Sequence, residues 1–126
     1  MQQADKLEKM FELRKIFMRR IKDLKQDEYP DWPIDIRDKK PQQHVRDMAL
    51  RGVEEMFEAL QHFKNWKPHR DAEIRDFDRD AFLEEIVDAF NYFFSVLVLT
   101  GISGDELFQA YVKKDEIIHR RLNDGY

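Results

Sequence analysis

The sequence predicts an all-α fold, a single domain over residues 1–126 built as a bundle of four to five helices. Apolar residues recur at helical spacing through most of the chain, and no segment shows the alternation of a half-buried strand. A chain of 126 residues is short for two independent cores. Hydrophobic residues make up 42% and charged residues 38%, which is typical of a globular protein rather than a disordered one.

Helical segments account for the periodicity in the first two thirds of the chain. The first is expected over residues 4–25 and the second over residues 43–63. Three prolines between them, in residues 29–41, predict a structured loop. After a polar connection, a third helix is expected to begin near Asp78 or Asp80, because either residue suits an N-cap.

The third helix is expected to end before Gly101, and the fourth to begin at Ser103 and continue to about Leu122. Glu106 lies three residues after Ser103, as in a capping box. The third helix, which includes residues 82–99, is apolar almost all round, so we expect it to be buried on most sides. Because so short a chain cannot easily cover that helix alone, the sequence predicts a homodimer or a higher oligomer.

Charge and composition exclude several classes of protein. The net charge of −4 disfavours binding to a nucleic-acid polymer. Cysteine is absent, so neither disulfides nor thiolate metal sites are available. The first ten residues lack the apolar core of a signal peptide, so we expect none, and the longest apolar stretch, residues 89–99, is too short to span a bilayer. We therefore expect no membrane partner and a cytoplasmic location, in a bacterium or, for a phage-encoded protein, in its host.

Two segments, GVEEMFEAL and FLEEIVDAF, each contain an acid pair at i and i+3: Glu55 with Glu58, and Glu85 with Asp88. Residues so spaced lie about 60° apart on a helix and project from one face. If the two helices pack together, four carboxylates converge, and their repulsion favours a bound divalent cation. All-oxygen ligands favour Mg²⁺, with Mn²⁺ as a substitute.

The alternative is that these acids form a solvated helix face. For Glu55 and Glu58 the helical wheel does not exclude it, since both lie off the apolar stripe. Glu85 and Asp88 lie on a helix that is apolar almost all round, where an unpaired buried charge is costly. That contrast favours the metal site.

The last helix has a further irregularity, because Asp115 interrupts its apolar line. Lys114, Arg120 and Arg121 flank the same region, and such cations beside a carboxylate-bound metal suit a polyphosphate. The alternative is a basic helix C-terminus that complements the helix dipole.

With both acid pairs placed, the chain resembles the all-α nucleoside triphosphate pyrophosphohydrolases, the MazG proteins and the dimeric dUTPases. The order EExxE, a gap, then EExxD carries the resemblance. FKNW at residues 63–66 is similar to FKxW of the dimeric dUTPase branch, which includes the phage dCTPase-dUTPases, and the tail KDEIIHRRLNDGY is similar to that branch's closing motif.

The resemblance implies hydrolysis of a deoxynucleoside triphosphate to monophosphate and pyrophosphate, with dUTP expected first and dCTP second. It implies that Glu55, Glu58, Glu85 and Asp88 hold Mg²⁺, and that Glu55 or Glu54 positions or deprotonates the attacking water. Phe63 is expected to pack in the core. Phosphate binding is assigned to Lys114 and Arg121, and base or sugar binding to Arg14, Trp66, Asn91, Asp115 and Tyr126.

Several base and sugar positions depart from the branch, notably Arg14, Asn91, Asp115 and Ile118, so the reaction is predicted more firmly than the base. A MazG-like enzyme with a broader preference, purines included, is the first alternative. A di-iron bundle would need Glu-x-x-His on two helices, and only Glu116 to His119 fits. A non-enzymatic helical adaptor is the last alternative. We expect the other histidines to be surface or loop residues rather than ligands: His44, His62 and His69.

Overall fold

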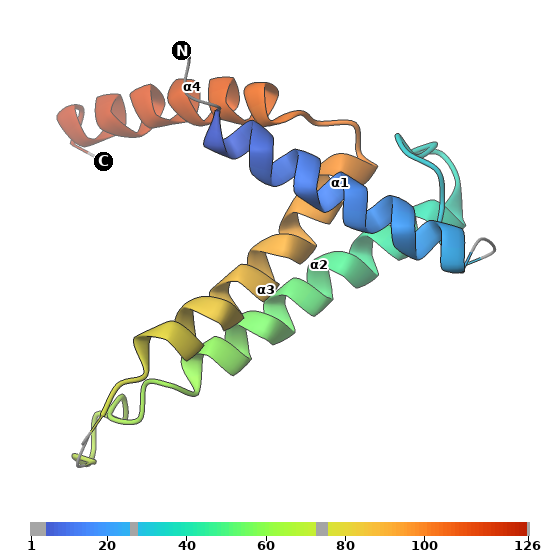
Figure 1. Ribbon diagram of the computed structural model, residues 1–126. Coiled ribbons are helices and arrows are strands. Elements are labelled where there is room, and N and C mark those ends of the chain that lie inside the picture. Colours follow the sequence, from blue (N-terminus) through green and yellow to red (C-terminus); the bar gives the residue numbers. More distant parts are fainter. Residues whose placement is uncertain (1–4, 26–27, 73–75, 126) are drawn as a thin grey trace. The chain divides into compact units, whose positions relative to one another are not determined.

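The computed structural model describes residues 5–25, 28–72 and 76–125 (Figure 1). Within these ranges the chain forms four helices and no strand, which confirms the predicted all-α class. The helices are α1 (Lys6–Leu24), α2 (Lys39–Leu60), α3 (Arg79–Leu99) and α4 (Gly104–Asn123). The chain divides into two compact units: Asp35–Val96, and Met1–Ile34 together with Leu97–Tyr126. The single domain over residues 1–126 stays a prediction.

Side-chain caps begin the two helices of the terminal unit. The Asp5 carboxylate accepts hydrogen bonds from the backbone N–H groups of Leu7 and Glu8, at 3.0 and 3.2 Å. Ser103 Oγ accepts the N–H of Glu106 at 3.1 Å, which confirms the serine half of the predicted capping box. Each cap satisfies backbone donors that the first turn of a helix leaves without a partner. Local sequence therefore sets where α1 and α4 begin.

The first turn of α4 packs against Glu8 of α1. A Cβ atom on Gly104 would lie 2.5 Å from Glu8 Oε1, so a larger residue would displace the carboxylate. That oxygen is buried and has no hydrogen-bond partner among the described residues. Asp105 and Glu106 follow in the same turn. A helix N-terminus favours nearby negative charge, and this one has three acids beside it.

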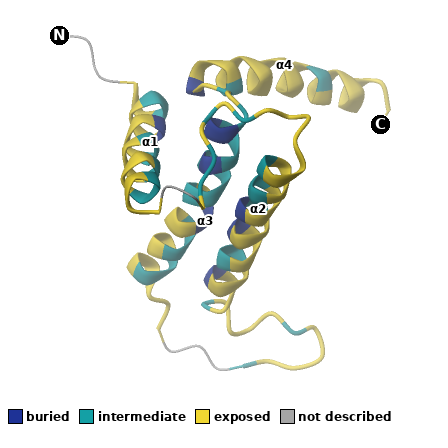
Figure 2. Cartoon of the chain, turned by 90° about the vertical axis from the view of Figure 1, so that its right-hand side faces the viewer, coloured by how far each residue is buried: buried dark blue, intermediate teal, exposed yellow. Residues whose placement is uncertain are grey.

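The other unit is a helical hairpin. In both views α2 and the part of α3 up to Val96 lie side by side and run in opposite directions (Figures 1 and 2). Gly52 allows the close approach, because a Cβ atom there would lie 2.6 Å from Cε1 of the Phe93 ring. Small side chains are frequent among the buried residues of the hairpin, which are Met48, Gly52, Ala59, Ala89 and Ser95. Their small size lets the backbones of α2 and α3 come close together along their line of contact, which we call the seam. Side chains beside the seam are then close together as well.

The bounds of α2 differ from the expected 43–63. The helix begins four residues earlier, and Pro41 lies in its first turn, where a missing N–H costs nothing. It ends at Leu60, and the N–H groups of residues 61–63 then donate to carbonyls three residues back, at 3.1, 3.1 and 3.0 Å. This tighter turn changes the direction of the side chains that follow α2.

The ends of α3 lie close to the prediction. Asp78 Oδ1 accepts the N–H of Ala81 at 3.0 Å, so Asp78 rather than Asp80 caps the helix. At the other end the helix stops at Leu99, and Gly101 adopts a φ of 78°. A left-handed backbone of this kind favours glycine and ends the helix.

One row of α3 is more exposed than its apolar composition predicts. Leu83, Val87 and Phe90 are 55%, 48% and 49% exposed in a single chain. They recur at i, i+4 and i+7, so they form one stripe along the helix. The expectation of burial on most sides is therefore wrong for the chain by itself. Among the described residues, neither α3 nor any other single helix is long and apolar enough to cross a membrane.

Candidate functional site

The two predicted acid pairs lie on the two helices of the hairpin, Glu55 and Glu58 on α2 and Glu85 and Asp88 on α3. Partial burial raises the pKa of Glu55 above its ordinary value, and the charge of Glu58 and a hydrogen bond with it raise the pKa further. The charges of Asp88 and Glu85, on the facing helix, act in the same direction. Like charges disfavour ionisation when they are near one another, so acids of both helices contribute to the environment of Glu55. We call these four residues the acid cluster.

A pocket lies at one end of the acid cluster. Its volume is about 250 Å³, and two of its walls are acid-cluster residues, one from each helix. The lining residues are Glu58, Gln61, His62, Lys64 and Glu85. Three of them come from the tight turn and connection that follow α2, so the pocket depends on the way that helix ends. It combines negative charge, a lysine and an imidazole.

His62 lies against Glu85. The two residues approach within 2.7 Å, from Nε2 to Oε2, and their side chains are 24% and 32% exposed. The two atoms are not aligned as a hydrogen bond. Glu85 Oε2 is buried, and it accepts no hydrogen bond from a described residue. His62 follows α2 in a turn, as a loop residue would, but it adjoins the acid cluster rather than the open surface.

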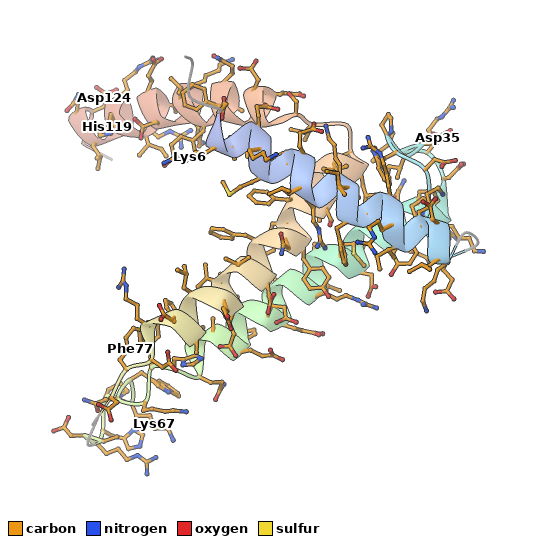
Figure 3. The ribbon with its side chains drawn as sticks, viewed as in Figure 1. Lys6, Asp35, Lys67, Phe77, His119 and Asp124 are labelled. Carbon is orange, nitrogen blue, oxygen red and sulfur yellow. The ribbon has the colours of Figure 1, made fainter. Side chains whose placement is uncertain are left out.

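Aromatic side chains hold the connection near His62. Phe63 stacks on Phe77, with ring centroids 5.6 Å apart, and meets Phe82 edge to face at 5.1 Å. The His62 ring lies edge to face with Phe82 at 6.1 Å. Phe77 and Lys67 are labelled in this connection (Figure 3). Phe63 is 44% exposed, so the expectation that it packs in the core is wrong; it belongs to an aromatic cluster at the end of the hairpin.

The residues of the acid cluster fit a hard divalent cation. Their donors are carboxylate oxygens, and one of these, Glu85 Oε2, is buried without a hydrogen bond from the described residues. Within the described ranges, however, no three acid or histidine side chains already have the arrangement of a metal-binding group. The chemistry of the donors thus suits a divalent cation, and the ligand roles of these residues stay predictions.

Glu54, the alternative candidate for positioning water, is exposed. It is not among the charges that act on Glu55. One helical turn before Glu55 on α2, Arg51 forms an ion pair with Asp47 at 3.0 Å and a hydrogen bond with Tyr92. Sequence reasoning missed this arginine because its neighbours on α3 become visible only once the helices are paired.

The predicted phosphate residues lie in the other unit. Lys114 and Arg121 are exposed on α4. Asp115 lies on the same helix, where its Oδ2 is 3.6 Å from His119 Nε2. Arg14 lies on α1, with its guanidinium 4.7 Å from the centre of the Phe17 ring. These residues belong to the terminal unit, and the acid cluster belongs to the hairpin.

Two further predicted base or sugar residues lie in the hairpin unit. Trp66 is 67% exposed in the α2–α3 connection, with Lys67 Nζ 5.7 Å from its ring. Asn91 is half-buried on α3, three residues beyond Asp88. Tyr126 lies outside the described residues. Lys64 in the pocket was missed, although it stands within the FKNW segment that carries part of the resemblance.

The acid cluster, the pocket and the His62 contact are all built by residues of the hairpin. The spacing of the acids along α2 and α3 positions the acid cluster. The turn after α2 positions His62 and the other pocket residues that follow the helix. Comparison of the chain with protein-family models, with curated proteins and with solved structures found no match in any of the three.

Proposed function

We propose that the chain is a magnesium-dependent nucleoside triphosphate pyrophosphohydrolase, which converts a deoxynucleoside triphosphate and water into the monophosphate and pyrophosphate. The observation that carries the proposal is that acids of both α2 and α3 lie near enough to Glu55 for their charges to raise its pKa. Such a cluster is costly without a cation, and a cation held by carboxylates is what a triphosphate needs. The sequence resemblance to the MazG and dimeric dUTPase bundles supports the same reaction and names dUTP, then dCTP, as preferred substrates.

In this proposal Glu55, Glu58, Glu85 and Asp88 hold the magnesium. When bound, the metal neutralises charge that develops on the phosphates and lowers the pKa of the attacking water. Glu55 is the proposed residue that positions or deprotonates that water at its carboxylate. Glu54 is the alternative base.

Cationic side chains bind the phosphates. Lys64 lines the pocket together with Glu58 and Glu85, so it would be available to bind the phosphates of a substrate held there. Lys114 and Arg121 of α4 are proposed as further phosphate-binding residues on the resemblance alone. Because phosphate contacts do not depend on the base, these residues supply affinity and leave the choice of base to other positions.

The decisive experiment is a panel of all common dNTPs and NTPs incubated with magnesium in ¹⁸O-labelled water. We expect pyrophosphate in one step, no nucleoside diphosphate intermediate, and label in the nucleoside monophosphate, because attack is at the α-phosphorus. Chromatography and mass spectrometry measure both products. Samples with EDTA serve as the metal-free control. Orthophosphate with nucleoside diphosphate would mean attack at the γ-phosphorus and would contradict the proposal.

The second candidate is a MazG-like enzyme of broader preference, purines included. It is favoured by Arg14, Asn91 and Asp115, which depart from the residues usual in the dUTPase branch. A mismatched buried donor or acceptor shifts preference between bases strongly. The same panel separates the candidates, since a purine triphosphate hydrolysed as fast as dUTP selects the second one.

We also propose that the enzyme is a homodimer and that its interface buries the exposed apolar stripe of α3. A stripe of three large apolar side chains, Leu83, Val87 and Phe90, is costly to leave in water. Light scattering at micromolar concentration is expected to give twice the 15.4 kDa mass of one chain. Val87→Glu should reduce the mass to that of the monomer, whereas Ile36→Glu, at a site that is 65% exposed outside the helices, should not. A monomeric wild type would refute the dimer.

A further inference from the structure

The contact between His62 and Glu85 has the geometry of two neighbouring metal ligands. Nε2 and Oε2 are 2.7 Å apart, yet the oxygen receives no hydrogen bond from the described residues. An imidazole that only steadied the carboxylate would point its N–H at the oxygen. By contrast, two donors bound to one octahedral ion at about 2.1 Å each lie about 3 Å apart, with neither aimed at the other.

A pocket adjoins both residues. His62 and Glu85 line the same pocket of about 250 Å³, and Glu58 of the acid cluster lines it as well. Glu85 is thus shared between the acid cluster and the histidine. An ion bound by Glu85 on the pocket side would lie within reach of a nitrogen ligand.

The histidine is held in place before any ion binds. Its backbone N–H donates to the carbonyl of Ala59 at 3.1 Å in the tight turn that ends α2. Its ring lies edge to face against Phe82, at 6.1 Å and 71°. Phe82 is held in turn by Phe63 and Phe77. A ring fixed from two sides loses little freedom when it binds a metal, which increases its value as a ligand.

We propose that His62 is a direct nitrogen ligand of the metal ion that Glu85 holds. The proposal deepens the proposed function and rests on its carboxylate-bound metal. An imidazole ligand strengthens the binding of Mn²⁺, Co²⁺ and Zn²⁺ relative to Mg²⁺, which prefers oxygen. The site would then accept transition metals more tightly than a site of carboxylates alone.

Pulsed electron paramagnetic resonance of Mn²⁺ bound to the full chain tests the proposal. A directly bound imidazole gives a ¹⁴N coupling to the manganese, and labelling the wild type with ¹⁵N-histidine should convert it into a ¹⁵N coupling. We expect His62→Gln to abolish the coupling and to weaken Mn²⁺ binding by about 10-fold. We expect Mg²⁺ binding to change much less. If the variant folds poorly, the labelled wild type still shows whether any histidine binds the metal, and a missing coupling there overturns the proposal.

His119→Gln is the matched control. His119 also lies beside a carboxylate, 3.6 Å from Asp115, but on exposed α4. This variant should keep both the coupling and the Mn²⁺ affinity. If Mn²⁺ binds to the wild type without nitrogen coupling, His62 is not a ligand, although the carboxylate site stands. If His62→Gln keeps the coupling, the ligand is another residue and the proposal fails. If Mn²⁺ does not bind at all, the proposed function fails as well.

Discussion

Glu85→Gln and Asp88→Asn are each expected to lower turnover of the preferred triphosphate by about 100-fold or more. Each change removes a charged oxygen ligand from the acid cluster and keeps the size of the side chain. We expect magnesium to raise the melting temperature of the wild type and not that of these variants, because an ion stabilises the fold only by binding it. Calorimetry with and without millimolar magnesium, beside a turnover assay, measures both effects.

Glu84→Gln is the control for this prediction. Glu84 stands next to Glu85 on α3 but is exposed, and it does not act on Glu55. It should retain both turnover and the magnesium response. If millimolar magnesium with a nucleotide analogue leaves the melting curve of the wild type unmoved, the metal site is wrong.

Glu55→Gln should separate stability from activity. Because the folded state raises the pKa of Glu55 above the ordinary 4.5, the folded chain binds a proton there more readily than the unfolded chain. The resulting stability is present below the unfolded pKa and is lost as the pH rises through the folded pKa. At neutral pH without metal, Glu55→Gln is therefore expected to be more stable than the wild type. It should also be inactive, and its stability should depend less on pH in the acidic range.

Gly52→Val is expected to cost about 3 kcal/mol of stability, because the new side chain would force α2 away from α3. Even a single Cβ atom would lie 2.6 Å from the Phe93 ring. Separating the helices should also weaken magnesium binding, since the ligands come from both sides of the seam. Denaturant unfolding and metal titration by calorimetry measure the two losses.

The second change Phe93→Leu provides the control for that prediction. It removes the ring that meets the new side chain, so the double variant should recover part of both the stability and the metal affinity. Two changes that act through one contact are not additive, and a double-mutant cycle measures their coupling. If the two losses simply add, Gly52 does not set the distance between the helices.

Sequence reasoning located the helices and the acids well because both depend on local patterns. Ser103 and Asp78 cap their helices within a few residues of chain, and acids at i and i+3 share a helix face wherever that helix packs. The beginning of α2 was misplaced, because Pro41 is acceptable in a first turn although it breaks a helix elsewhere.

The rest of the site could not be predicted, because it depends on contacts between distant residues. His62 faces Glu85 only because α2 ends in a tighter turn and because Phe82 holds the ring from the next helix. Lys64 reaches the pocket for the same reason. Positions 62 and 85 are not related by any regular sequence spacing. A histidine in a loop therefore favours the prediction of a surface residue.

The position of Glu8 has a consequence for where phosphates can bind. The N-terminus of a helix favours the binding of an anion. At the N-terminus of α4, however, the carboxylate of Glu8 lies beside Gly104, and Asp105 and Glu106 follow in the same turn. A triphosphate brought there would meet three negative charges. This end of α4 is therefore unfavourable for the phosphates of the proposed substrate, and we expect lysine and arginine side chains to bind them instead of the α4 dipole.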